Sequence, residues 1–274
     1  MRGHTRVVVG AILTLGCSCV LFTDLNEFSS EENAKEEPDG SGGAQDANGG
    51  DVPDSAPFDA GSSSDADADA SDGCLYCENF DDDGALVRSN LRIFDRFEPK
   101  PTIQLDPLST SAPSSLRILA DPVHYDGRAH LEQVVDVGEV KSVRCAFDLR
   151  IETIPLEGSY LIFSFGVVEG TGSQFANFAM GSNGRTELSK DGDDVFTEGP
   201  PLTAATWQRV ILTLVRAPSP KLAVSIGAAT ASKDLAGWEV TPKLGIAAGL
   251  KWGNPYGSTP SLDMRIDTIR CEAL

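Results

Sequence analysis

The chain has 274 residues, of which 41% are hydrophobic, and a formal net charge of −19. This length can hold one well-cored domain with appended segments. The acidic balance excludes a nucleic-acid-binding protein, which needs a basic surface to displace counterions from phosphates. Most of the acidity lies in residues 20–73, which carry fifteen Asp or Glu and a single Lys, whereas residues 74–274 have a net charge of only −7.

The N-terminus has the pattern of an export signal, which we place at residues 1–19. Basic Arg2 and Arg6 precede an apolar run that is too short to span a bilayer. The Thr-Leu-Gly-Cys sequence that ends at Cys17 resembles the bacterial lipobox, with a threonine where that motif usually has an aliphatic residue. The resemblance implies that Cys17 is acylated, and Ser18 after it implies an outer-membrane or cell-surface lipoprotein. An ordinary cleaved signal, with a secreted or periplasmic product, is the alternative.

Residues 20–73 are predicted to be a disordered linker. They consist mainly of Glu, Asp, Gly, Ser, Ala and Pro, so little apolar surface offsets the entropy of ordering them. The alternating Asp-Ala run at 65–70 could supply oxygen ligands to calcium, but it lacks the Gly and Glu of an EF-hand loop. We therefore interpret the run as a solvated spacer.

The sequence of residues 74–274 predicts one all-β domain. Short apolar runs alternate with Gly, Pro, Asn and Asp, and Val143 to Ile151 shows strict period-two alternation. Asn183-Gly184 between two such runs is typical of a hairpin turn. The expected strands cover residues 115–120, 130–136, 142–151, 159–168, 174–181, 207–216, 221–227, 244–250 and 262–271.

The order of several short motifs resembles the laminin-G-like family of concanavalin A-type jelly rolls. The motifs are Cys-Glu-Asn-Phe-Asp at 77–81, Ser-Leu-Arg at 115–117, the strand around 147–150, Thr-Trp-Gln-Arg-Val at 206–210 and Arg-Ile-Asp-Thr-Ile-Arg at 265–270. The resemblance covers residues 74–274 and implies a two-sheet antiparallel jelly-roll sandwich.

Four cysteines of this domain are predicted to form two disulfides, because an exported chain folds in an oxidising compartment. Sequence allows three pairings of Cys74, Cys77, Cys145 and Cys271. In a jelly roll the first and last strands are neighbours, which favours one bond from the Cys74/Cys77 pair to Cys271 and the other to Cys145. A zinc site at the Cys-x-x-Cys pair is the alternative.

Asp81 and Asp267 are candidate calcium ligands. Related sandwich lectins hold a structural metal between their terminal strands, and hard oxygen ligands suit calcium. Both residues could equally serve turns and loops.

The fold resemblance implies a carbohydrate- or glycoconjugate-binding module that acts as a monomer. Sugar binding needs an aromatic ring and a few polar groups, and the candidate aromatics are Tyr125, Phe178, Trp252 and Tyr256. No strand carries the alternating carboxylates of glucanases, so no enzyme is expected. The alternatives are a polysaccharide lyase that uses His124 and Tyr125, and a structural or adhesive envelope protein.

Overall fold

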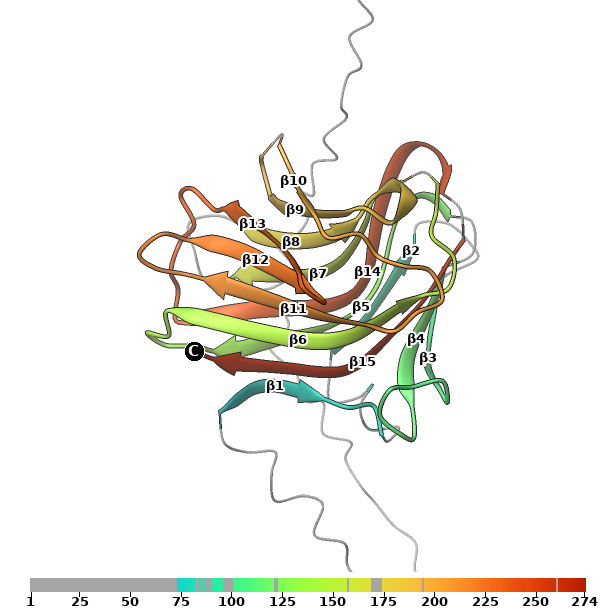
Figure 1. The fold of residues 1–274 in the computed structure, drawn as a ribbon, viewed down its shortest axis with the longest axis horizontal. Helices are drawn as coiled ribbons and strands as arrows, with labels where there is room; N and C mark the ends of the chain where they lie inside the picture. The colour runs from blue at the N-terminus through green and yellow to red at the C-terminus, as the bar shows by residue number, and fades with distance from the viewer. Residues whose placement is uncertain are drawn as a thin grey trace, which may run out of the picture.

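Two antiparallel β-sheets lie face to face in the computed structural model (Figure 1). The structure describes residues 73–81, 84, 86, 90–95, 101–120, 123–156, 158–168, 174–193, 195–259 and 261–274. The expected signal segment, the acylated Cys17 and the acidic linker lie outside these residues. Among the described residues, no helix has the length and apolar character needed to cross a membrane.

The first sheet, sheet A, has eight strands. In spatial order they are β13 (Ala229–Asp234), β12 (Lys221–Ile226), β11 (Gln208–Val215), β6 (Ser142–Ile151), β15 (Leu262–Ala273), β4 (Ser115–Ala120) and β3 (Thr102–Asp106), with β1 (Cys74–Glu78) paired to β15. The last strand of the chain, β15, therefore lies beside the first.

The second sheet, sheet B, has seven strands and carries the only described 3-10 turn, η2 (Ser182–Gly184), between two of them. In spatial order the strands are β10 (Thr197–Gly199), β9 (Thr186–Lys190), β8 (Phe175–Met180), β7 (Tyr160–Val167), β14 (Lys243–Thr259), β5 (Val123–Asp136) and β2 (Asn90–Asp95). The long strands β14 and β5 run side by side along most of their length.

The core lies between the two sheets. In β6 the odd-numbered residues are buried and the even-numbered ones are partly exposed, as the alternation in sequence predicts. Phe147 of sheet A stacks on Phe163 of sheet B with 5.1 Å between ring centroids, and Phe178 meets Phe147 edge to face at 6.5 Å. Each such fully buried ring stabilises the sandwich by roughly 1.5 to 3 kcal/mol relative to an exposed one.

The all-β sandwich is confirmed, and each of the nine strands expected from the sequence corresponds to one in the structure. The hairpin expected at Asn183-Gly184 joins β8 to β9, and Asn183 adopts a φ of 59° there. Sequence reasoning missed β1, β2, β3, β9, β10 and β13, and it underestimated the lengths of β5 and β14.

All four cysteines are in disulfides, but the pairing differs from the one we favoured. The bonds are Cys74–Cys77 and Cys145–Cys271. Cys145 and Cys271 are directly opposite each other on β6 and β15, with 4.0 Å between their Cα atoms, and both are buried. The expected adjacency of the first and last strands is real, yet β6 covers the other side of β15 and supplies the closer partner.

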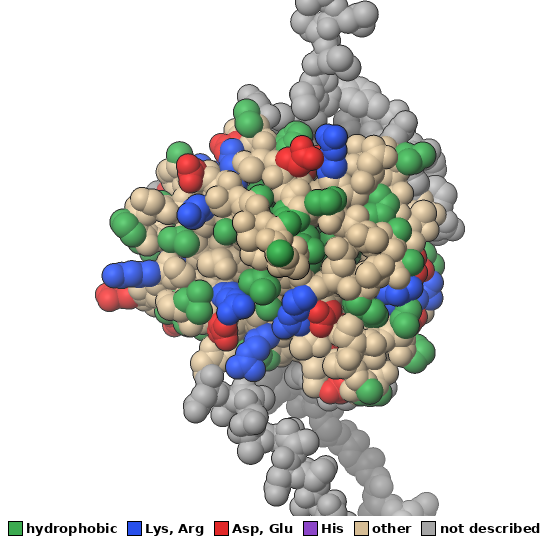
Figure 2. Space-filling view, viewed as in Figure 1, with side chains coloured by type: hydrophobic (Ala, Val, Ile, Leu, Met, Phe, Trp, Pro, Cys, Tyr) green, Lys and Arg blue, Asp and Glu red, His purple; other side chains and the backbone are tan. Residues whose placement is uncertain are grey.

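A network of ion pairs covers part of the outer face of sheet A. Its basic members Arg117, Arg265 and Arg150 are aligned on three adjacent strands. Asp106, Glu152 and Asp263 form salt bridges with them. Figure 2 shows this side of the molecule, where basic side chains lie beside acidic ones over β6, β11 and β15.

The network lowers the pKa of two carboxyl groups, those of Asp106 and Glu152. Burial alone would raise the pKa of Asp106, but the hydrogen bond from Arg265 and the nearby guanidinium charges lower it overall. The hydrogen bond from Arg150 is the main cause that lowers the pKa of Glu152. These groups therefore favour the folded state in their charged form.

Candidate functional site

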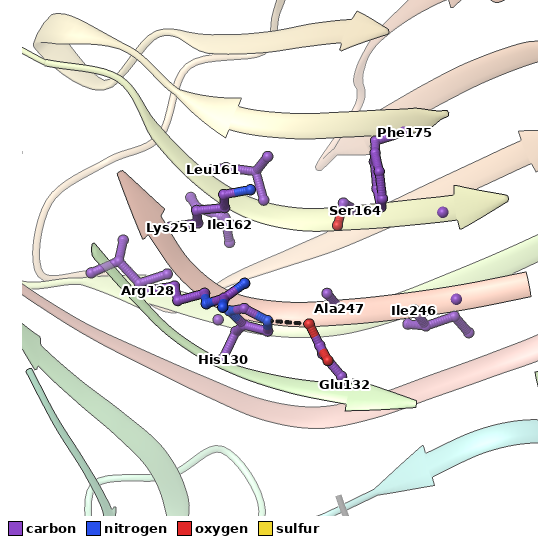
Figure 3. A pocket seen from close by; sticks show the side chains of 14 residues that line it. Arg128, His130, Glu132, Leu161, Ile162, Ser164, Phe175, Ile246, Ala247 and Lys251 are labelled. Atoms are coloured by element: carbon purple, nitrogen blue, oxygen red, sulfur yellow. Dashed lines mark hydrogen bonds and ion pairs between the residues drawn. The ribbon is translucent and has the colours of Figure 1, made fainter. Parts of the chain in front are cut away.

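Three charged or titratable side chains of β5 project from the outer face of sheet B. Ala129 and Leu131 are fully buried between the sheets, so the alternation of a strand directs Arg128, His130 and Glu132 to the opposite face. They line a hollow, which we call the cleft (Figure 3).

The floor of the cleft is made by small residues on the two strands that follow β5 across the sheet. Gly245, Ala247 and Gly249 of β14 line it, together with Ser164 and Gly166 of β7. The absence of large side chains in the middle of this face leaves a hollow that opens to solvent. Its remaining lining includes Leu161, Phe175 and Lys251.

Gly249 fixes how β14 lies against β5. It sits directly opposite His130 with a φ of +147°, which side chains other than hydrogen rarely allow. A Cβ atom at this position would come within 2.5 Å of the His130 Cα. The pairing of β14 with β7 also shifts register between Ala248 and Lys251. Lys251 pairs with Arg128 in the unbroken register of β14 and β5, and the shift places it opposite Leu161 on β7.

His130 and Glu132 form the central contact of the cleft. Nε2 of His130 lies 2.6 Å from Oε1 of Glu132, and Arg92 Nε donates to the other carboxylate oxygen at 3.3 Å. Burial would raise the pKa of Glu132, but the hydrogen bond with His130 and the charges of His130 and Arg92 lower it overall. Glu132 is therefore a carboxylate that orients the imidazole.

A second polar pair lies next to the cleft on sheet B but is not part of its lining. Asn177 of β8 is opposite Ser164 on β7, and its Nδ2 donates to Oδ1 of Asp191 at 2.8 Å. Burial raises the pKa of Asp191, which the hydrogen bond from Asn177 and the charge of Lys251 only partly offset.

The structure describes the side chain of only one of the four aromatic residues predicted to bind a ligand. Phe178 is 0% exposed and packs in the core, so the structure contradicts its assignment to a sugar platform. Tyr125 pairs through its backbone with Asn254, and Trp252 pairs with Gly127 and Tyr160, beside the cleft. The side chains of Tyr125, Trp252 and Tyr256 lie outside the described residues.

The aspartates predicted to bind calcium are placed differently from each other. Asp267 is 0% exposed, and its two carboxylate oxygens accept hydrogen bonds from the backbone and hydroxyl groups of Thr110 and Ser111 and from the backbone of Thr268. Asp81 accepts a hydrogen bond from Asn79. In the part of the chain that the structure describes, no three His, Cys, Asp or Glu side chains are grouped to hold a metal ion. Asp267 thus anchors the 110–111 loop, and calcium stays an untested prediction.

Sequence reasoning missed Arg128, His130, Glu132 and Lys251. One signal for the first three was available, because Arg-Ala-His-Leu-Glu at 128–132 alternates polar and apolar residues and runs into the strand expected at 130–136. That pattern indicates a polar face with three functional side chains in a row. Lys251 was missed because the expected strand ended at residue 250, whereas β14 continues to Thr259.

The comparisons with known proteins establish a fold but no family. No family model matches the chain, and no curated protein matches it. Solved structures do match. The marine PL-14 alginate lyase from Aplysia kurodai is 10% identical with a TM-score of 0.55, and the match covers 73% of this chain and 99% of that one.

Two further structures have the same fold. A sialidase is 14% identical with a TM-score of 0.53, over 73% of this chain and 18% of the sialidase chain. The cellulose-induced protein Cip1 is 12% identical with a TM-score of 0.51, over 67% of this chain and 91% of that one. At these identities the likeness shows a shared concanavalin A-like jelly roll. The laminin-G-like relationship stays a prediction.

The expectation that the domain is not an enzyme needs correction. It depended on finding no catalytic constellation in the sequence, whereas the cleft brings a histidine, a carboxylate and two cationic side chains together. An alginate lyase also shares the fold along nearly its whole length. The reasoning failed because it looked for the paired carboxylates of glucanases, which are not the only catalytic groups that this fold can carry.

Proposed function

We propose that the cleft binds an acidic, uronate-containing polysaccharide and cleaves it by β-elimination. The observation that carries the proposal is the placement of Arg128, His130, Glu132 and Lys251 around a floor of glycine and alanine. The alginate lyase among the proteins of similar fold supports it. The small residues leave space for a sugar ring, and the cationic groups suit a carboxylate.

The reaction removes a proton from the sugar and creates negative charge on its carboxylate. A base removes the proton from C5 of the uronate, the electron pair forms a C4=C5 double bond, and the C4–O bond breaks. Negative charge develops on the carboxylate of the sugar before the leaving oxygen takes up a proton. Cations beside that carboxylate lower the barrier because they stabilise the charge where it develops.

The side chains of the cleft suit these roles. In one tautomer His130 donates its Nε2 proton to Glu132, which leaves the Nδ1 lone pair as the base. The imidazolium that forms can return the proton to the leaving oxygen, so that no other reactant is needed. Arg128 and Lys251 bind and neutralise the uronate carboxylate.

The chain's location agrees with such a substrate. Two disulfides favour an exported domain, because thiols stay reduced in the cytosol. Acylation at Cys17, as part of the proposal, would hold the cleft at the cell envelope, where polysaccharides from outside can reach it.

The test uses the full-length chain with a panel of uronate polymers of different linkage and neutral polymers as controls. We expect unsaturated products from at least one uronate polymer, and a loss of turnover of at least roughly a hundredfold in His130→Ala. His124→Ala, on the same strand, is the matched control and should retain activity. Saturable binding without unsaturated product would reduce the function to carbohydrate binding. An absence of both binding and cleavage across the panel would refute the proposal.

A further inference from the structure

The two disulfides of the domain lie in opposite surroundings. Cys145 and Cys271 are both 0% exposed, in the core between the sheets. The Cys74–Cys77 bond lies on β1, where Cys77 is exposed and Cys74 is half-buried. Among the described strands β1 pairs only with β15, so no strand covers its other edge (Figure 1). Dissolved thiols can therefore reach one disulfide and not the other.

The register of β1 with β15 gives the two exposed-face sulfurs different electrostatic neighbours. Paired residues of antiparallel strands project to the same face, with their Cβ atoms about 5 Å apart. Cys77 is opposite Arg270, and Cys74 is opposite Glu272. The side chain of Arg270 is 47% exposed, and its salt bridge to Glu272 is long, with 3.7 Å between Nε and the carboxylate oxygen. A guanidinium thus lies beside Cys77, whereas a carboxylate lies beside Cys74.

We propose that the Cys74–Cys77 bond is a site of thiol–disulfide exchange with a dithiol, and that Cys77 is its reactive sulfur. A nearby cation stabilises a thiolate, which is the form of cysteine that attacks disulfides, and a nearby anion opposes it. The charges of Arg270 and Glu272 therefore favour the thiolate at Cys77 and the neutral thiol at Cys74. This site is independent of the carbohydrate chemistry proposed for the cleft, which lies on the other sheet.

The exchange takes place in two steps. A thiolate of the dithiol attacks the sulfur of Cys77, the S–S bond breaks, and the sulfur of Cys74 leaves and takes up a proton. The second thiol of the dithiol then loses its proton and attacks the partner sulfur of the mixed disulfide, so that Cys77 leaves as a thiolate beside Arg270. The dithiol loses two electrons and becomes a disulfide, and the cysteine pair gains these electrons.

The fold does not depend on this bond. The Cys74–Cys77 bond joins residues three apart in sequence, whereas the Cys145–Cys271 bond joins residues 126 apart. A short closed loop constrains the unfolded chain little, so its opening removes little stability. The strand β1 is also held by its backbone pairing with β15 and by the burial of Tyr76. The pair can thus change between its oxidised and reduced forms in a folded domain.

The first experiment titrates the wild-type full-length chain with dithiothreitol at neutral pH. Free thiols are then blocked with N-ethylmaleimide, and the labelled peptides are identified by mass spectrometry. We expect labelling of Cys74 and Cys77 at a dithiothreitol concentration at least roughly tenfold below the one that labels the other pair, while the domain stays folded. Labelling of both pairs together, or of neither before the domain unfolds, would overturn the proposal.

A second experiment identifies the reactive sulfur. Cys74→Ser leaves Cys77 as a free thiol, and Cys77→Ser is the reciprocal variant. With glutathione disulfide as the probe, Cys77 should form the mixed disulfide at least roughly tenfold faster than Cys74 does. Equal rates, or a faster reaction at Cys74, would exclude Cys77 from this role.

Arg270→Gln in the Cys74→Ser background tests the influence of the cation. It should slow the formation of the mixed disulfide at Cys77 by roughly threefold or more, because less thiolate is present at neutral pH. Arg144→Gln is the matched control, because Arg144 also pairs with Glu272 but lies on β6, which does not pair with β1. It should leave the rate unchanged. Equal effects of the two substitutions would contradict the assignment of Arg270 as the group that activates Cys77.

Discussion

Gly249→Ala offers a sharp test of how the cleft is built. The new Cβ would lie 2.5 Å from the His130 Cα and 2.6 Å from the Ala129 carbonyl oxygen. Both are backbone atoms of β5 and cannot turn aside. Ordinary contact begins at 3.4 Å, so the strands must separate by about 0.9 Å at this point.

Two costs add in this variant. A side chain at positive φ is strained by roughly 1 to 2 kcal/mol, and forced overpacking adds roughly 1 to 3 kcal/mol. For a domain of this size the sum lowers the melting temperature by roughly 5 to 15 °C. A displacement near 1 Å of a reacting group can reduce turnover by about a hundredfold.

The assay combines thermal unfolding with the ultraviolet absorbance of the unsaturated product. Gly192→Ala is the matched control, because Gly192 also has a positive φ of +83° but no atom within 4 Å of an added Cβ. It should show only the backbone strain and retain turnover. A folded Gly249→Ala protein with turnover within about twofold of the wild type would refute the claim that Gly249 positions His130.

Three further outcomes are expected. Replacing Cys145 and Cys271 by alanine should lower the free energy of unfolding by roughly 5 kcal/mol, and removing the other disulfide by about 2 kcal/mol, because the closed loops differ greatly in length; equal losses in denaturant titrations would contradict this. Asp106 and Glu152 have lowered pKa values in the folded protein, so their stabilising effect is present at neutral pH and is lost as pH falls below about 5. Melting temperatures measured from pH 7 to pH 3 check this, and a flat profile would be inconsistent with it. Lys251→Met should raise KM for a uronate polymer about tenfold and weaken its dependence on salt, and an unchanged KM would exclude Lys251 from substrate binding.

The sequence predicted the sandwich because its strands alternate strongly. Val143 to Ile151 shows the two faces directly, and burial follows the same alternation. The short edge strands were not predicted, because an exposed strand can lack an apolar face. An example is β13, with sequence Ala-Thr-Ala-Ser-Lys-Asp. Local pattern therefore predicts most strands that contribute to the core and misses the edge strands, although it also missed β9, which lies inside sheet B.

The candidate site was harder to predict, for a physical reason. Phe175 and Phe178 are three residues apart on one strand, so they face opposite sides of the sheet. Each is preceded by an amide residue and followed by an alanine, so nothing local says which of them faces the core. The structure buries Phe178 and leaves Phe175 in the cleft, the reverse of what the sequence interpretation required.

Charge alone does not locate the site in this fold. Sheet A has as many arginines in its ion-pair network as carboxylates, and Arg265 bonds to three of those carboxylates, so its charges are satisfied by one another. Sheet B differs because its middle strands lack side chains of any size at Gly166, Gly245 and Gly249. In the proposed function, that gap is the space in which a sugar ring would meet the charged groups around it.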